Sequence, residues 1–277
     1  MKYCAFADEA SSNMSGQIAA LKRNDFQYLE IRGVDGTNIS KISADKAKEV
    51  KKMLDDAGLA VWSIGSPIGK FAMDKDISEH LEVYKRVLEN SYILGAQRIR
   101  MFSFHPVEGD DAATTKQKAF ERLDKLVAMT PKDRILCHEN EKHIYGETAE
   151  ACLEVIKTFP TIRAVFDPAN FVQCGVDTLA AWDILKEHVD YLHIKDALAD
   201  GTVVPAGQGV GNVEAIVKAY VAQGGEVVTL EPHLQSFVGL SALENGESVK
   251  NGGVSYKSND ESFDAAVSAI KAIVAKL

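Results

Sequence analysis

Residues 135–146 read ILCHENEKHIYG, and this stretch decides how the rest of the chain is interpreted. Its first three residues form an apolar run that is typical of a buried strand. The next four residues, HENE, are all polar, whereas a strand that returned to solvent would more often end in Gly, Pro, Asp or Ser. If other strands end in the same way, their polar ends indicate a shared site.

Short β-type runs alternate with longer amphipathic stretches along the chain. The strand-like runs lie at residues 2–7, 28–32, 60–65, 98–104, 134–139, 162–167, 189–194 and 226–231. A (β/α)8 barrel takes about 250 residues, or roughly 30 for each strand–helix unit, and eight such units fit this chain. The pattern therefore predicts the α/β class, as a single (β/α)8 TIM barrel spanning residues 1–277, with an eight-stranded parallel barrel and outer helices.

A doubly wound open sheet is the alternative that the alternation leaves open. Such a sheet would usually carry a Gly-rich phosphate-binding turn after its first strand, and residues 6–16, FADEASSNMSG, are not one. Residues 232–260, between the last strand and the last helix, form a long insertion rich in Gly, Ser and Asn. Because it also contains Phe237, Val238 and Leu240, we expect this insertion to lie against the barrel mouth.

Composition narrows the classes of partner. The formal charge of −9 argues against nucleic acid, since phosphate binding needs a basic face. No apolar run approaches the ~20 residues of a membrane span, and the N-terminus lacks the pattern of a signal peptide. The four cysteines show no CxxC spacing, as expected of reduced thiols. We therefore expect a cytoplasmic protein with no nucleic acid or membrane partner, and leave a homo-oligomer open.

Four successive strand runs end in residues that bind metals. Glu139, Asp167, His193 and Glu231 occupy equivalent places, and in a TIM barrel the carboxyl ends of the strands build the active site. Three carboxylates gathered with one imidazole repel unless a cation joins them. This ligand set suits one divalent ion, namely Mn²⁺, Mg²⁺, Co²⁺ or Zn²⁺. Glu141 competes with Glu139 for one position, and we prefer Glu139 because it lies closer to the apolar run.

An ordered series of short blocks carries a resemblance to a known family. The blocks are FADE, YLEIR, RIRMFSF, HENE, FDPAN, HIKDA, PAGQG and LEPH. In this order the chain resembles the xylose isomerase-like TIM barrel superfamily, in its sugar phosphate isomerase/epimerase branch. The resemblance implies a divalent metal held by the same four residues, with Glu139 and Glu231 also acting as acid and base. It implies that Lys195 reaches the substrate, and the chain departs from many relatives by carrying Asn170 in place of His.

These features together predict a metal-dependent sugar or sugar phosphate isomerase or epimerase. It would transfer a proton next to a carbonyl through an enediolate. The residues expected to bind substrate are His105, Lys195, Glu141, Arg32, Trp62 and Asn170. A metal-dependent lyase or hydrolase acting on keto-sugars or glycosides is one alternative, and a sugar-binding module without turnover is another.

Overall fold

Eight parallel strands close a barrel within residues 1–240 and 255–277, the parts of the chain that the computed structural model describes. The barrel strands are β1 (Lys2–Ala5), β2 (Tyr28–Ile31), β5 (Ala60–Gly65), β6 (Arg98–Met101), β7 (Ile135–Glu139), β8 (Arg163–Phe166), β9 (Val189–Ile194) and β12 (Val227–Leu230). Neighbours pair in this order, and β1 pairs with both β2 and β12 to close the ring. The predicted TIM barrel is therefore confirmed.

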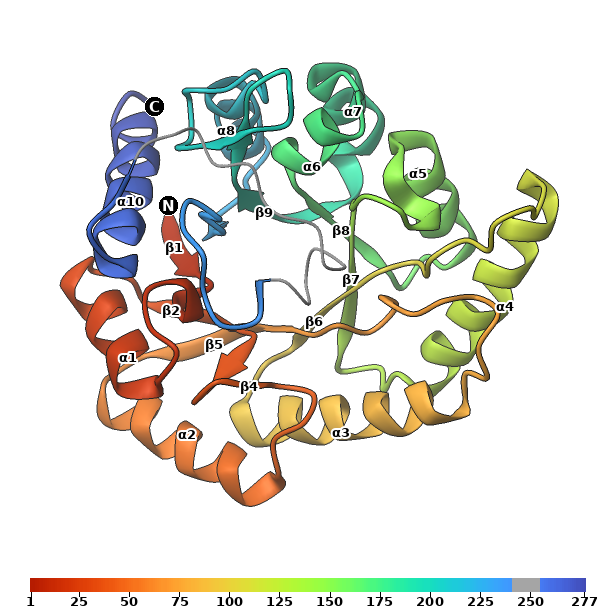
Figure 1. The fold of residues 1–277 in the computed structure, drawn as a ribbon, viewed down its shortest axis with the longest axis horizontal. Helices are drawn as coiled ribbons and strands as arrows, with labels where there is room; N and C mark the ends of the chain where they lie inside the picture. Colours follow the sequence, from red (N-terminus) through yellow and green to blue (C-terminus); the bar gives the residue numbers. More distant parts are fainter. Residues whose placement is uncertain (241–254) are drawn as a thin grey trace.

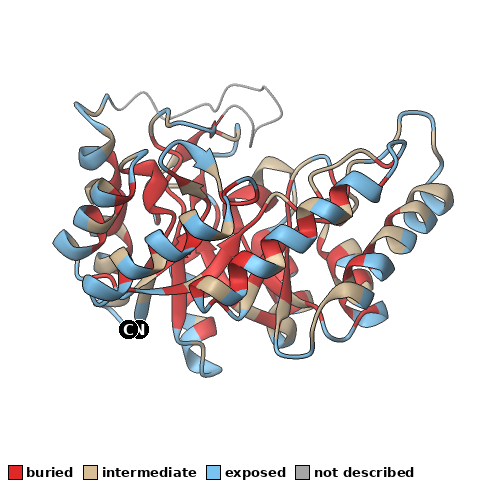
Figure 2. Ribbon diagram, turned by 90° about the horizontal axis from the view of Figure 1, so that it is seen from below, coloured by how far each residue is buried: buried red, intermediate tan, exposed pale blue. Residues whose placement is uncertain are grey.

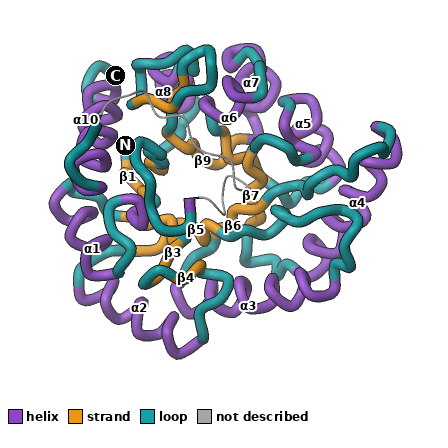
Figure 3. The backbone as a smooth tube through the Cα atoms, in the orientation of Figure 1, coloured by secondary structure: helices purple, strands orange, loops and turns teal. Residues whose placement is uncertain are grey.

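Helices surround the barrel as an outer ring (Figures 1 and 3). They are α1 (Met14–Arg23), α2 (Ala44–Asp56), α3 (Ser78–Leu94), α4 (Ala112–Met129), α5 (Ala149–Thr158), α6 (Pro168–Gln173), α7 (Thr178–Leu185), α8 (Val213–Ala222) and α10 (Asn259–Val274). Capping side chains set several of their starts. Ser43, Asp111 and Ser258 each accept a hydrogen bond from a first-turn backbone N–H, which satisfies a donor that the helix leaves free.

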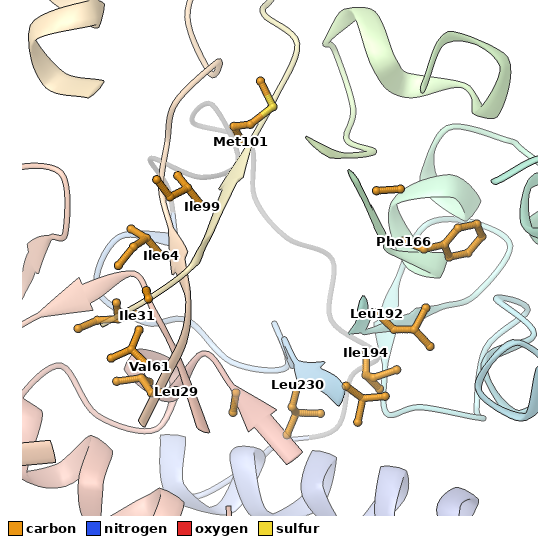
Figure 4. Close-up of a cluster of buried hydrophobic side chains, with 14 of the residues drawn as sticks. Leu29, Ile31, Val61, Ile64, Ile99, Met101, Phe166, Leu192, Ile194 and Leu230 are labelled. Carbon is orange, nitrogen blue, oxygen red and sulfur yellow. The ribbon is translucent and has the colours of Figure 1, made fainter. Parts of the chain in front are cut away.

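Strand alternation divides the core into two parts. One set of side chains, including Leu29, Ile99 and Leu192, points away from the barrel axis and packs against the helices (Figure 4). The buried faces of the outer helices meet this layer, while their other faces are exposed (Figure 2). A second, smaller apolar cluster is formed by Cys137 and Tyr191 with Val165, and it lies inside the barrel. Above it the interior side chains become polar, which makes the upper barrel available for chemistry.

Two hairpins and a short α-helix lie between the expected elements. They are the hairpin of β3 (Gly33–Val34) and β4 (Thr37–Asn38), the hairpin of β10 (Asp196–Ala197) and β11 (Val203–Val204), and α6. All of them follow the carboxyl ends of barrel strands. The short helix α6 starts here because Asp167 caps it and Pro168 occupies its first position, where no N–H partner is needed.

The insertion predicted at residues 232–260 is described only in part, since residues 241–254 lie outside the described ranges. Its first part follows β12 across the barrel mouth, where the Phe237 ring lies 4.8 Å from the guanidinium carbon of Arg32. Its last residues belong to α10, which begins at Asn259. Among the helices in the described part of the chain, none is long and apolar enough to cross a membrane.

Candidate metal centre

Four buried side chains meet at the carboxyl ends of neighbouring strands. Glu139 ends β7, Asp167 directly follows β8, His193 lies near the end of β9, and Glu231 directly follows β12. One ligand-type atom from each of them lies within 4.8 Å of the others. The structure thus brings together all four residues that the sequence nominated as ligands.

One oxygen of the Asp167 carboxylate accepts a hydrogen bond, and the other faces the Lys195 ammonium at 3.2 Å. Its Oδ1 accepts the backbone N–H of Asn170 at 2.9 Å, as the cap of α6, while its Oδ2 has no hydrogen-bond partner. The Asn140 side chain fixes the backbone at this point by donating to the Asp167 carbonyl and accepting its N–H, both at 2.9 Å. Burial raises the pKa of Asp167 to about 6, with Glu139 and Glu231 adding repulsion. Oδ2 is therefore the oxygen available to a cation.

The His193 imidazole is oriented by a carboxylate behind it. Its Nε2 lies 3.1 Å from Oε2 of Glu30, and Glu30 also accepts the Tyr191 hydroxyl at 2.8 Å. On the other side, Nδ1 lies 2.9 Å from Oε1 of Glu139 and 3.5 Å from Oε2 of Glu231. An imidazole that donates from Nε2 presents a lone pair at Nδ1, so two carboxylates and a lone pair face one another. A proton or a metal ion must lie between them.

The protonated form of His193 is favoured when no metal is present. Burial opposes a charge on the ring, but Glu139 and Glu30 raise the pKa of His193 well above its usual range. The same geometry suits a metal ligand, because the carboxylate on the far nitrogen fixes both the ring orientation and the tautomer. The residues present therefore fit a divalent ion with oxygen ligands and one nitrogen ligand.

Two cations hold the Glu231 carboxylate. Arg32 donates from Nη1 to Oε1 at 2.8 Å, and the Lys195 ammonium lies 3.3 Å from Oε2. Burial alone would raise the pKa of Glu231, but the charges of Lys195 and His233 hold it well below its usual range. Glu231 is consequently ionised at neutral pH, which both a metal ligand and a proton acceptor require.

Lys195 lies within the centre itself. Its ammonium is 3.2 Å from Oδ2 of Asp167 as well as 3.3 Å from Glu231. Burial would lower the pKa of Lys195, but the surrounding carboxylates raise it well above its usual range. A buried, charged donor between two candidate ligands is positioned to contact a group bound there.

The other residues expected to bind substrate take different places. Arg32 lies between the rings of Phe6 and Phe237 and pairs with Asp8 and Glu231. Glu141 pairs with Lys70 at 2.8 Å and stands outside the four-residue group.

Asn170 and His105 make contacts that position other parts of the mouth. The Asn170 side-chain amide donates to the Asn140 carbonyl at 2.9 Å and to Oε1 of Glu139 at 3.3 Å. Asn170 therefore orients a candidate ligand. The Nδ1 of His105 lies 2.8 Å from the His143 carbonyl oxygen, so this contact joins two mouth loops.

Trp62 lies at the opposite end of the barrel from the centre. Its ring stacks on the Arg98 guanidinium at 3.8 Å and meets the ring of Tyr28, and both partners begin their strands. The expectation that Trp62 contacts substrate at the mouth is wrong. Trp62 lies near the N-terminal end of β5. Residue type alone does not indicate how far along the barrel axis a strand residue lies.

Several polar residues of the centre were not nominated as site residues. Glu30 orients His193, Arg100 lies 3.3 Å from Oε2 of Glu139, and the backbone N–H of His233 donates to Glu9 at 2.6 Å. A signal for the first two is present in the sequence, because YLEIR and RIRM place charges within apolar strands. Such a charge is buried only if it is paired, which indicates a polar barrel interior.

The PAGQG block shapes the loop after β9. The backbone N–H groups of Gly207, Gly209 and Gly211 all donate to the carboxylate of Asp196 at 2.9–3.0 Å. A side chain at Gly209 would place its Cβ 2.3 Å from the carbonyl oxygen of Ala197. The glycines thus allow a tight loop around one buried carboxylate.

Comparison with known proteins agrees with this architecture. Residues 18–249 match the model of the xylose isomerase-like TIM barrel family. No curated protein matches the chain in sequence. Among solved structures, the probable 3-DHS dehydratase AsbF of Bacillus anthracis, involved in petrobactin synthesis, is 15% identical with a TM-score of 0.74, over 98% of this chain and 99% of that one.

Two further structures are similar over the whole length. The IolI protein with a binding zinc atom is 17% identical with a TM-score of 0.73, over 100% of this chain and 99% of that one. The D-psicose 3-epimerase of Clostridium cellulolyticum H10, solved with D-tagatose, is 14% identical with a TM-score of 0.73, over 99% of both chains. At these identities the likeness shows the fold.

Proposed function

Because the chain belongs to the xylose isomerase-like TIM barrel family, we propose that it is a divalent-metal-dependent isomerase or epimerase of sugars or sugar phosphates. The observation that carries this proposal is the arrangement at His193. Its Nδ1 faces the carboxylates of Glu139 and Glu231, and Asp167, whose Oδ2 forms no hydrogen bond and lies 3.2 Å from the Lys195 ammonium, belongs to the same group. A solved relative by fold holds zinc, and others are named as epimerases, which is consistent with the proposal.

Glu139, Asp167, His193 and Glu231 would hold the ion. When bound, a divalent ion supplies positive charge that stabilises the negative charge developing on the oxygens of a ketose during enolisation. Mn²⁺, Mg²⁺, Co²⁺ and Zn²⁺ all suit three carboxylates and one imidazole.

Glu139 and Glu231 are the proposed acid–base pair. They come from β7 and β12, which are separated in the ring by β8 and β9, so they approach the centre from its two sides. Two carboxylates on opposite sides can remove a proton from one face of a substrate carbon and return one to the other face. Return to the same carbon gives an epimer, and return to its neighbour gives an isomer.

Positioning groups support each member of the pair. Lys195 and His233 keep Glu231 ionised, so that it can accept a proton, and Arg32 fixes its Oε1 at 2.8 Å. Asn170 and Arg100 lie beside the two oxygens of Glu139 at 3.3 Å each. The Lys195 ammonium is also available to donate a hydrogen bond to a sugar hydroxyl next to the reacting carbon.

Exchange of substrate hydrogen with solvent tests this function. The protein would be stripped with a chelator, reloaded with each of the four metals, and incubated with a panel of ketoses in D2O. We expect deuterium at the carbon next to the carbonyl, with formation of an epimer or isomer, only in metal-loaded protein. Loss of water or bond cleavage would indicate the lyase alternative, and binding without exchange would indicate a module without turnover.

A further inference from the structure

A cavity of about 310 Å³ adjoins the centre on the side of β1, β2 and β5. Its walls come from the loops after these strands, including the β3–β4 hairpin (Figure 3), and from the start of the segment after β12. All of these follow carboxyl ends of barrel strands, so the cavity opens on the same face as the four candidate ligands. Its volume lies at the lower end of the range for small-molecule pockets, about 300–1,000 Å³.

The Arg32 side chain joins the cavity to the centre. Arg32 lines the cavity and donates to Oε1 of Glu231 at 2.8 Å. Lys70 lines it as well and donates to Oε2 of Glu141 at 2.8 Å. A molecule bound at the centre would therefore extend its far end along Arg32 toward the hairpin.

The cavity is positively charged in a chain whose formal charge is −9. Arg32, Lys41 and Lys70 line it together with a single carboxylate, Asp8. Both oxygens of Asp8 accept from Arg32, at 2.9 and 3.0 Å, and Lys70 pairs with Glu141, so the charge of Lys41 is the one left without a partner among the described residues. Local positive charge at the wall of an acidic protein indicates an anionic ligand.

Lys41 differs from the other two cations of the cavity. Arg32 and Lys70 each pair with carboxylates, whereas the ammonium of Lys41 makes no ion pair or hydrogen bond with residues 1–240 or 255–277. Beside it, Asn38 uses its Oδ1 to accept from Ser40 at 2.7 and 3.0 Å, which leaves its amide N–H groups as donors. Phe237 and Val238 also line the cavity and offer apolar surface.

We propose that this cavity binds the far, anionic end of the substrate and that Lys41 sets this specificity. This inference rests on the proposed function, and it narrows the substrate class to sugars that carry a carboxylate or a phosphate away from the reacting carbonyl. The anion pairs with Lys41 and accepts from the Asn38 amide, while Phe237 covers the apolar face of the carbon chain. A carboxylate and a phosphate would make the same contacts here, and the experiment below distinguishes between them.

The test uses three six-carbon ketoses that differ only at C6. These are D-fructose, D-fructuronate and D-fructose 6-phosphate, which carry a hydroxymethyl group, a carboxylate and a phosphate ester. Their dissociation constants would be measured by calorimetry on metal-loaded protein, together with deuterium exchange in D2O. The parent protein is compared with Lys41→Gln and Lys41→Glu. Lys48→Gln is the matched control, because Lys48 is an exposed lysine of α2 that pairs with Asp45 outside the cavity.

We expect the parent to bind at least one anionic sugar about 10-fold more tightly than D-fructose. Lys41→Gln should reduce this ratio about 5- to 10-fold, Lys41→Glu should reduce it further, and Lys48→Gln should leave it unchanged. The preference should also weaken in high salt, because Lys41 is accessible to solvent. Whichever anionic sugar binds more tightly than the other identifies the natural anionic group as a carboxylate or a phosphate.

Three results would overturn the inference. The first is equal binding of neutral and anionic sugars by the parent, the second is an equal loss in Lys41→Gln and Lys48→Gln, and the third is binding of no sugar. A different result would contradict the proposed function alone. In that result the anionic sugars bind through Lys41, but none of the three ketoses exchanges hydrogen with solvent.

Discussion

The two ends of the barrel interior handle charge in different ways. At the base, Arg98 pairs with Asp190 and stacks on Trp62, and both charged side chains remain partly exposed, at 18% and 15%. At the mouth, one connected group contains six carboxylates, three permanent cations and two histidines among the described residues. The carboxylates are Asp8, Glu9, Glu30, Glu139, Asp167 and Glu231, the cations are Arg32, Arg100 and Lys195, and the histidines are His193 and His233.

This difference shows which end is built for a ligand. The base is neutral as it stands. The mouth carries a net charge of −3 when both imidazoles are neutral and of −1 when both are protonated. Buried charge of one sign is costly unless it is compensated. A divalent cation supplies the compensation at the mouth, and nothing comparable is required at the base.

The largest expected effect comes from removing a carboxylate at the mouth. Glu139→Gln and Glu231→Gln should each reduce deuterium exchange by about 10²–10⁴, the usual contribution of general acid–base catalysis, and lost metal ligation adds to this. Exchange rates and metal content of purified variants check the prediction. Exchange at the parent rate in both variants, with metal bound normally, would show that neither glutamate acts on the substrate.

Asp190→Asn at the base is the control for these variants. It breaks the ion pair with Arg98, so the free energy of unfolding should fall by about 1–3 kcal/mol. Exchange and metal content should stay at the parent level. If this variant lost activity as the mouth variants do, the two ends could not be assigned separate roles.

A smaller effect is expected from the carboxylate behind His193. Glu30→Gln keeps the shape but weakens the hydrogen bond to Nε2, so metal affinity should fall about 10- to 100-fold. Ser63→Ala is the control, because Ser63 contacts the same Tyr191 hydroxyl at 3.1 Å without touching His193. Metal titration with a competing chelator measures both variants. Equal affinities would mean that Glu30 only fills the barrel.

The smallest effect concerns His138, a buried histidine outside the four-residue centre. His138 lies on the outer face of β7, neither ring nitrogen has a hydrogen-bond partner, and burial lowers its pKa to about 4. Between this value and about 6.5, the unfolded chain binds a proton that the native ring does not. Native stability should therefore fall as the pH drops from 6.5 to 4, by up to about 1.4 kcal/mol per pH unit.

Denaturant unfolding of metal-free protein across this pH range checks the prediction. His138→Leu should flatten the dependence, because leucine does not titrate and the site offers no hydrogen bond to lose. His188→Gln, in the turn before β9, should not flatten it. An unchanged slope in His138→Leu would show that other groups control acid stability.

Local patterns were sufficient for the barrel and for its ligand candidates. Apolar runs and helical stretches repeat about every 30 residues, and in parallel strands the carboxyl ends must meet at one face. Glu139, Asp167, His193 and Glu231 could therefore be grouped without coordinates, because each lies at or near the end of a strand-like run. Their spacing along the chain already implies their meeting in space.

For the remaining polar side chains of the barrel, tertiary structure decided the position along the barrel axis and the contacting partners. Trp62 and Ser63 are adjacent in the sequence, yet Trp62 lies at the base while Ser63 contacts the Tyr191 hydroxyl higher in the barrel. The pairing of Glu30 with His193 joins residues 163 positions apart, and the position of Lys41 on a cavity next to Arg32 depends on an unpredicted hairpin. Sequence periodicity specifies which face of a strand a residue occupies. Strand tilt, register and loop packing specify what that residue meets there, and these arise only when the barrel closes.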